Sequence, residues 1–172
     1  MDSSAEHPIH LGTAEALRIV DFQPAYQPEF YRLNAAWIEP NFGLEAEDIQ
    51  FLQNPQSEIL DKGGAIWFAL LDNQVVGTCG MQKLDATTYE MVRLAVDVNF
   101  QGQQIGKKLI RHAIQWVHAM PDATVILESS SQLVNKRAVQ LYEKLGFRHY
   151  EPLPAHRSPL ARANVFMKLD RP

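Results

Sequence analysis

Hydrophobic and polar positions change their spacing along the chain, and each change predicts a new element. Short apolar and β-branched residues at positions 17–22 predict a first strand. Residues 28–37 carry apolar side chains at helical spacing, and the segment 40–43, which contains Pro40, predicts the end of that helix. A second helix is expected over residues 44–52, because acidic residues in its first turn suit the positive end of the helix dipole.

The middle of the chain switches to the short apolar runs that are typical of strands. Residues 65–71 and 75–81 are two such runs, and the polar residues at 72–74 between them predict a β-hairpin. Residues 89–98 predict a third consecutive strand. Strands joined by such short connections pair as antiparallel neighbours.

Helices and strands alternate in the last part of the chain. Residues 103–120 carry apolar side chains at helical spacing opposite basic and polar ones, which predicts an amphipathic helix. A short buried strand is expected over 124–127, followed by a helix that ends before Gly146, where a left-handed residue suits a helix terminus. One strand that begins at Phe147 and a last strand over residues 163–169 complete the order. The sequence therefore predicts an α+β fold with a mixed sheet.

Chain length and composition predict one domain. The chain has 172 residues, of which 46% are hydrophobic. A chain of this size buries roughly 70% of the surface that its unfolded form exposes, so it needs no metal or disulfide to hold a core. We expect residues 15–172 to form a single domain and the polar residues 1–14 to be a flexible N-terminal tail. A monomer and a homodimer both remain open.

Charge and cysteine content argue against several partners and predict a compartment. A formal net charge of −4 argues against binding to nucleic acid or to an anionic membrane by bulk attraction. Cys79 is the single cysteine, is expected in the core, and cannot form an intramolecular disulfide. The acidic, polar N-terminus does not have the pattern of a signal peptide, and no apolar run approaches the roughly 20 residues of a membrane span. We therefore expect a cytoplasmic protein, and the spacing of the histidines predicts no metal site.

The first segment with candidate chemistry, residues 99–108, joins the third hairpin strand to the amphipathic helix. It contains Gly102 and Gly106, followed by Lys107 and Lys108. Backbone N–H groups at such a turn, together with the helix dipole, make an anion site that suits a pyrophosphate. An ordinary tight turn is the alternative, and the segment matches neither a P-loop nor a G-x-G-x-x-G motif.

A second segment, residues 135–147, reads N-K-R-A-V-Q-L-Y-E-K-L-G-F, and the two segments together resemble the Gcn5-related N-acetyltransferases (GNAT). That family has a loop of Gln or Arg, two variable residues, Gly, one variable residue, and Gly or Ala, and a later helix that ends in Leu-Tyr-x-Lys-x-Gly-Phe. Gln101 and Gly106 fill the outer loop positions, whereas Gln104 stands where the family usually has glycine. The resemblance implies the GNAT fold, a central mixed, mostly antiparallel sheet of about seven strands flanked by about four helices.

The resemblance also implies acetyl-CoA as the co-substrate and assigns residues to its binding. Backbone groups of Leu94, Ala95 and Val96 would hold the pantetheine arm like an added strand. The remaining assigned residues are those of the pyrophosphate loop and two residues of the later motif: Gln101, Gly102, Gln103, Gln104, Ile105, Gly106, Lys107, Asn135 and Tyr142. If the backbone at Gln104 has a positive φ, its side chain costs about 1 kcal/mol relative to glycine.

Two residues are candidates for catalysis. Tyr142 matches the family tyrosine that protonates the departing coenzyme A thiolate, and a purely structural core aromatic is the alternative. Glu90 lies on the third hairpin strand, where several family members that acetylate amines have a glutamate. An amine with a pKa of about 10 is mostly protonated at neutral pH, so some group must accept its proton. An exposed strand position without a catalytic role is the alternative for Glu90.

Residues for the acceptor are assigned from the family's binding loops and helices. Glu39 would attract a cationic substrate, whereas Arg157 and Arg162 would bind a substrate carboxylate as a pair, with a plain surface loop as the alternative. The resemblance as a whole implies an acetyl-CoA-dependent N-acetyltransferase in which a small-molecule or peptide primary amine attacks the thioester directly, without a metal. A non-catalytic acyl-CoA sensor or an interaction module on the same fold is the alternative.

Overall fold

One continuous sheet organises the molecule. The computed structural model describes residues 16–171, so the predicted tail at residues 1–14 lies outside the described residues. Within this range, seven strands form one sheet in the order β1-β2-β3-β4-β5-β7-β6. Strands β4 and β5 pair in parallel, and the other adjacent strands pair antiparallel. The predicted α+β fold with a mixed, mostly antiparallel sheet and four α-helices is confirmed for the part of the chain that the structure describes.

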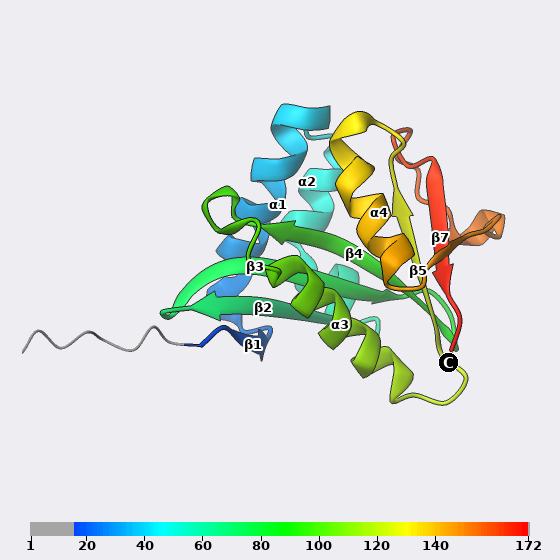
Figure 1. The fold of residues 1–172 in the computed structure, drawn as a ribbon, viewed down its shortest axis with the longest axis horizontal. Coiled ribbons are helices and arrows are strands. Elements are labelled where there is room, and N and C mark those ends of the chain that lie inside the picture. The colour runs from blue at the N-terminus through cyan, green and yellow to red at the C-terminus, as the bar shows by residue number, and fades with distance from the viewer. Residues whose placement is uncertain (1–15, 172) are drawn as a thin grey trace, which may run out of the picture.

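Figure 1 shows the arrangement of the elements. The strands are β1 (Arg18–Asp21), β2 (Ala65–Leu71), β3 (Gln74–Lys83), β4 (Thr88–Val96), β5 (Thr124–Ser129), β6 (Arg148–His149) and β7 (Val165–Leu169). The α-helices are α1 (Gln27–Phe42), α2 (Ala46–Gln53), α3 (Ile105–His118) and α4 (Lys136–Lys144). A π-helical turn at Gln56–Leu60, which the sequence pattern did not predict, follows α2.

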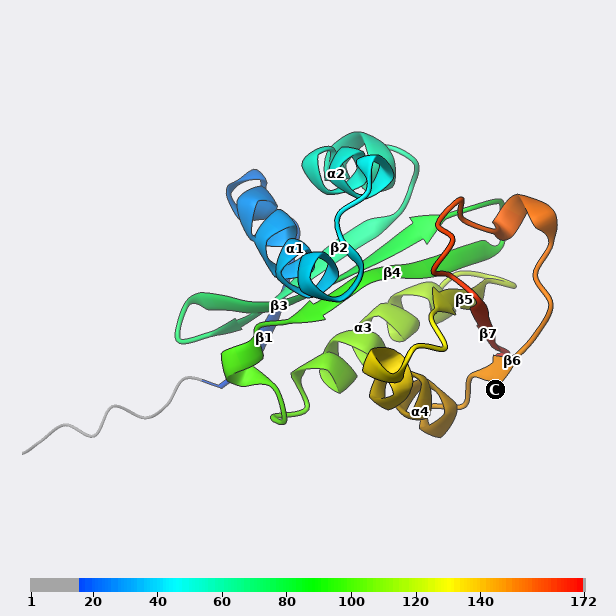
Figure 2. The same ribbon diagram turned by 90° about the horizontal axis from the view of Figure 1, so that it is seen from above.

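The sheet separates two hydrophobic cores, because apolar side chains project from both of its faces. Along β2, Trp67 and Ala69 belong to the core with α3, whereas Ile66 and Phe68 belong to the core with α1 and α2. Figure 2 shows the resulting layers, with α1 and α2 on one face of the sheet and α3 and α4 on the other. A strand that is buried on both faces reads as a continuous apolar run, which is why the pattern predicts β2 with the bounds observed.

The predicted end of the first helix is wrong. Helix α1 continues through Pro40 to Phe42 and ends at Gly43, where φ is +77°. Pro40 lies in the last turn, so it removes a single hydrogen bond, to the carbonyl of Ala36, and Ala36 lies on the exposed side of the helix. Water can satisfy that carbonyl, and the helix therefore continues past the proline.

Two predicted turns agree with the backbone conformation. Asp72 and Asn73, between β2 and β3, have φ values of 49° and 61°, as the central residues of a type I′ hairpin turn do. At the end of α4, Gly146 has a φ of 98° and donates its N–H to the carbonyl of Glu143. A glycine adopts this left-handed conformation without steric cost, so it ends the helix and turns the chain towards β6.

Candidate active site

Strands β4 and β5 run apart at the centre of the sheet (Figure 1), and a cleft lies between them. Their pairing ends at Met91 and Leu127, although β4 continues to Val96 and β5 to Ser129. The space between them has a volume of about 840 Å³. Residues from both strands, from α1, α2 and α4, and from the segment 155–163 line it.

A β-bulge changes the course of β4 beside the cleft. The register of β4 with β3 slips around Arg93, which has a φ of 55°. Beyond Met91, the edge of β4 that faces β5 has no strand partner among the described residues, so its backbone N–H and C=O groups are open to the cleft. The three residues predicted to hold the pantetheine arm, Leu94, Ala95 and Val96, follow the bulge and line the cleft.

The predicted pyrophosphate loop leads into the N-terminus of α3. Gly102 and Gln104 both have left-handed backbone, with φ values of 80° and 62°, and Gln104 is the N-cap of the helix. The N–H of Lys108 donates to the carbonyl of Gln104 at 3.1 Å, and the N–H groups of the first turn before it have no intrahelical partner. Together with the helix dipole, these N–H groups favour a phosphate anion.

The loop residues do not all reach the cleft. Those that line it are Gln101, Gly102 and Gly106. The side chain of Ile105 is buried in the core with α3, so only its backbone is available to a ligand. The loop residues that are not among those lining the cleft are Gln103, Gln104 and Lys107, besides Ile105. The side chain of Gln104 is exposed, so its departure from glycine does not obstruct the cleft itself.

Tyr142 lies on α4, and its side chain forms part of the cleft wall. The residue is 8% exposed, and its ring packs edge-on against Phe147 with 5.9 Å between the ring centroids. Burial raises the pKa of its phenol above the usual value, so the hydroxyl remains protonated at neutral pH. None of the described residues forms a hydrogen bond with that hydroxyl. Tyr142 is thus both a core residue and a proton donor open to the cleft.

Glu90 is a buried carboxyl group on β4 that lines the cleft, so the alternative of an exposed strand position does not hold. Burial and, secondly, the charge of Glu128 raise the pKa of Glu90 to about 8, while the charge of Arg93 acts in the opposite direction. Glu90 lies beside Ile126 in the parallel ladder, and Glu128 follows two residues later on β5. Both acids therefore project from the same face of the sheet.

Asn135 precedes α4 as its N-cap and also lines the cleft. Its Nδ2 donates to the hydroxyl of Ser129 at 3.3 Å. Its Oδ1 is buried and has no hydrogen-bond partner among the described residues. A buried acceptor without a partner is costly, so this oxygen suits a ligand that brings an N–H group into the cleft.

The two arginines predicted to act as a pair line the same cleft but bind different carboxylates. Arg157 pairs with Glu151, and its guanidinium lies over a phenyl ring at 4.7 Å. Arg162 donates to both carboxylate oxygens of Asp48, at 2.6 and 3.1 Å. The structure therefore separates the predicted pair into two ion pairs.

Asp48, Arg93 and Glu128 are site residues that the sequence reasoning missed. Asp48 lies fully buried in the first turn of α2 and also accepts a hydrogen bond from Arg93 at 2.8 Å. Its burial alone would raise its pKa, but hydrogen bonds from Arg162 and Arg93 hold the pKa of Asp48 below its usual value. First-turn acids are common and exposed, so nothing local distinguishes Asp48. For Glu128 a signal existed, because it is a charged residue directly after the buried run 124–127.

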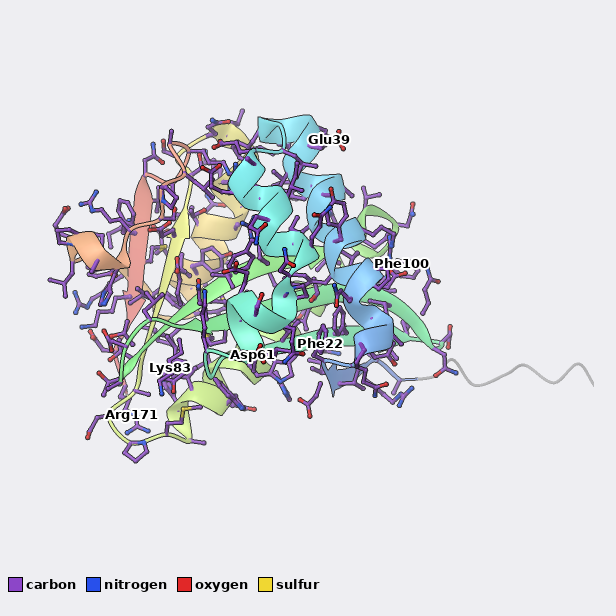
Figure 3. The ribbon with its side chains drawn as sticks, turned by 180° about the vertical axis from the view of Figure 1, so that it is seen from behind. Phe22, Glu39, Asp61, Lys83, Phe100 and Arg171 are labelled. Carbon is purple, nitrogen blue, oxygen red and sulfur yellow. The ribbon has the colours of Figure 1, made fainter. Side chains whose placement is uncertain are left out.

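Glu39 is exposed at the end of α1 (Figure 3) and is not among the residues that line the cleft. Its predicted role in substrate binding therefore has no support in the geometry. Cys79 is buried, and burial raises the pKa of its thiol to about 12, which agrees with a core residue rather than a nucleophile.

Residues 16–171 contain neither a metal-ligand cluster nor a membrane-spanning helix. In that range, no group of three or more His, Cys, Asp or Glu side chains is placed to hold a metal ion. No helix in the same range has both the length and the apolar character to cross a membrane.

The chain matches one protein-family model and a set of curated relatives. The model, described as the acetyltransferase (GNAT) family, matches residues 18–147. The N-acetylaspartate synthetase of Mus musculus is 35% identical to this chain over 116 residues, which are 66% of this chain and 36% of that protein. The match therefore spans little more than a third of the relative's length.

Solved structures share the fold over most of the chain. An acetyltransferase of the GNAT family from Staphylococcus aureus superposes with a TM-score of 0.80 at 24% identity, covering 90% of this chain and 98% of that one. The PaiA N-acetyltransferase from Thermoplasma acidophilum, solved in complex with coenzyme A, superposes with a TM-score of 0.69 at 16% identity. The superposition covers 91% of this chain and 100% of that one. At these identities, the likeness concerns the fold.

Proposed function

The chain belongs to the acetyltransferase (GNAT) family, and from this we propose that it is an acetyl-CoA-dependent N-acetyltransferase that acts on a primary amine. The cleft between β4 and β5 carries the proposal, because it brings the carboxyl group of Glu90 and the phenol of Tyr142 to one space. Direct attack of an amine on a thioester needs one group that accepts a proton and one that donates a proton. Glu90 and Tyr142 have those chemical properties.

Three features of the cleft fit the parts of acetyl-CoA, which supplies the acetyl group as a thioester. The unpaired N–H groups in the first turn of α3 suit the pyrophosphate. The open edge of β4 at Leu94, Ala95 and Val96 suits the peptide-like amides of the pantetheine arm. The unpartnered Oδ1 of Asn135 is an acceptor for an N–H of the same arm.

Glu90 accepts the proton of the amine in this proposal. The amine nitrogen bonds to the acetyl carbon, and the proton that it loses passes to the Glu90 carboxylate, directly or through water. A pKa of about 8 brings this carboxyl group close to the pKa of an amine, which favours proton transfer between them. The carboxylate form becomes more abundant as the pH rises, so the rate should rise with pH.

Tyr142 donates the second proton. As the bond between the acetyl carbon and sulfur breaks, its hydroxyl proton passes to the sulfur, and solvent returns a proton to the phenolate. The products are the N-acetylated amine and free coenzyme A. No covalent intermediate with the enzyme is part of this scheme, which agrees with the buried position of Cys79.

A thiol-release assay tests the proposed function. Purified protein with acetyl-CoA and a panel of free amino acids, peptides, polyamines and aminoglycosides should release coenzyme A with at least one class of amine. The double variant Glu90→Gln, Tyr142→Phe is the matched control, and it should bind acetyl-CoA while releasing little thiol.

Ligand-dependent stabilisation gives a second readout. Acetyl-CoA should raise the Tm of the protein, because a ligand that binds only the folded state stabilises it by mass action. The absence of any shift at millimolar acetyl-CoA would contradict the proposal. A shift without transfer to any amine would favour a non-catalytic acyl-CoA sensor.

A further inference from the structure

Arg93 has more hydrogen-bond donors than the chain itself satisfies. Its side chain is 13% exposed, and it lines the cleft. A guanidinium group has five N–H donors, and among the described residues the one hydrogen bond of Arg93 runs from Nη1 to Asp48. The ring of Phe51 covers one face of the guanidinium, with 4.9 Å from Cζ to the ring centroid. The remaining N–H edge of a largely buried cation is therefore left for a ligand.

The charged groups that act on Arg93 balance its charge only in part. Asp48 is shared by Arg93 and Arg162, so one carboxylate faces two guanidinium groups. Glu45 approaches Arg162 at 3.5 Å, but its side chain is 45% exposed and water screens its charge. Glu90 also acts on Arg93, and with a pKa of about 8 it is mostly neutral at pH 7. An anionic ligand would complete the charge balance.

The backbone conformation of Arg93 is strained, and it directs the side chain towards α2. Its φ of 55° is rare for a residue with a Cβ atom. Strict alternation along β4 would place Arg93 with Tyr89 and Met91, which belong to the core with α3. The bulge instead brings the side chain to Asp48 and Phe51 on α2. Strain of this kind persists where surrounding contacts hold it, and it is concentrated at ligand sites.

We propose that Arg93 binds a carboxylate of the acceptor, so that the acceptor class is amines that carry a carboxylate, such as free amino acids. This inference rests on the proposed function of the cleft. A guanidinium binds a carboxylate through paired, charge-assisted N–H bonds. Arg93 follows Glu90 by three residues on β4 and both line the cleft, so the amine and the carboxylate of one small molecule reach the two side chains together.

Matched pairs of an L-amino acid and its α-amide test the inference, for example alanine with alaninamide and leucine with leucinamide. Titration calorimetry on the complex with coenzyme A measures binding, and the thiol-release assay measures kcat/KM. The acid should bind at least about 10-fold more tightly than its amide, and its kcat/KM should be at least about 10-fold higher, because the amide offers no negative charge to Arg93.

Variants of Arg93 link that preference to the residue. Arg93→Gln should lower the affinity for the acid by at least about 10-fold and leave the affinity for the amide unchanged. Arg93→Lys should recover part of the affinity for the acid, because lysine keeps the charge without the paired geometry. Arg148→Gln is the matched control, since Arg148 forms an exposed pair with Asp170. Urea unfolding verifies that each variant is folded, and Arg162 still neutralises Asp48 when Arg93 is replaced.

Each outcome decides for or against the inference. Equal binding of acid and amide, a preference that survives in Arg93→Gln, or no binding of either ligand would overturn it. The proposed function fails in a different way. In that case no amine is acetylated, while calorimetry still measures the preference for the acid and its loss in Arg93→Gln.

Discussion

Arg162 and Asp48 lie 114 residues apart in the chain and form a two-point ion pair. Nη2 donates to Oδ1 at 2.6 Å and Nη1 donates to Oδ2 at 3.1 Å, and Asp48 is fully buried. The pair joins the segment 155–163, which lines the cleft, to the first turn of α2. The side of the cleft that carries Arg93 and Arg162 therefore depends on one buried carboxylate.

Asp48→Asn should destabilise the protein strongly. The variant leaves two largely buried guanidinium groups without their shared carboxylate, and breaking a buried ion pair in this way costs about 3 kcal/mol of the free energy of unfolding. Urea denaturation at neutral pH measures the change. Because the pKa of Asp48 is lower in the folded protein than its usual 3.8, its contribution is present above pH 3.8 and is lost as the pH falls further.

The exposed pair of Arg148 and Asp170 provides the control for that experiment. Asp170→Asn should change the free energy of unfolding far less than Asp48→Asn does, because water screens exposed ion pairs. If Asp48→Asn costs no more than Asp170→Asn, the buried pair does not hold the segment to α2.

Glu90→Gln should lower kcat and move the rise of rate with pH to more alkaline values. In the wild type, the rate should rise through a pH of about 8, where Glu90 loses its proton. Steady-state kinetics across pH, with an amine found in the screen, measures both parameters. Affinity for acetyl-CoA should not change.

Glu128→Gln is the companion variant for that series. The charge of Glu128 raises the pKa of Glu90, so its removal should move the rate profile to lower pH.

If Glu90→Gln raises KM for the amine and spares kcat, Glu90 binds a cationic substrate instead of accepting a proton. If neither parameter nor the profile changes, Glu90 has no role in the reaction.

The same carboxyl group should make stability depend on pH. The pKa of Glu90 is about 8 in the folded protein, against an ordinary value of 4.5, so the folded state holds this proton more tightly than the unfolded state does. The contribution of the group is complete below pH 4.5 and is lost as the pH rises to about 8. The Tm of Glu90→Gln relative to wild type should therefore increase across this range and then level off. A constant difference in Tm would show that the pKa of Glu90 is not raised.

Tyr142→Phe should reduce turnover by about 100-fold or more and leave acetyl-CoA binding nearly unchanged. The substitution removes the hydroxyl and keeps the ring that packs against Phe147. Steady-state kinetics and calorimetry measure the two quantities. Tyr89→Phe is the matched control, because Tyr89 is buried against Trp116 and is not among the residues that line the cleft. A fully active Tyr142→Phe enzyme would make Tyr142 a structural residue alone.

Gln104→Gly should raise the free energy of unfolding by about 0.5–1 kcal/mol, because glycine adopts the left-handed backbone at this position without steric cost. Urea denaturation measures it, and calorimetry should find the affinity for acetyl-CoA unchanged or tighter. Gln103→Gly is the control, since Gln103 has no positive φ and glycine there should lower stability. A large loss of affinity in Gln104→Gly would reveal a contact of the Gln104 side chain with the ligand.

Local patterns in the sequence were sufficient for those features that neighbouring residues decide. A continuous apolar run determined the bounds of β2, and a glycine after the last helical turn determined the end of α4. The motif that contains Tyr142 and the strand that carries Glu90 were also correctly located, and both side chains line one cleft. Helical and strand periods specify such positions because they depend on spacings of a few residues.

Tertiary structure alone decided the side of the cleft that carries Arg93 and Arg162. Whether Asp48 is a solvated first-turn acid or a buried anchor depends on Arg93 and Arg162, which lie 45 and 114 residues away in the chain. The direction of Arg93 depends on a bulge that breaks the alternation of β4, and no period in the sequence contains that break. The sequence by itself determined the elements and the motifs of the cleft, whereas the pairing order of the strands and the divergence of β4 and β5 determined which charges meet there. Burial is a property of the folded chain, and the charge balance of this site follows from it.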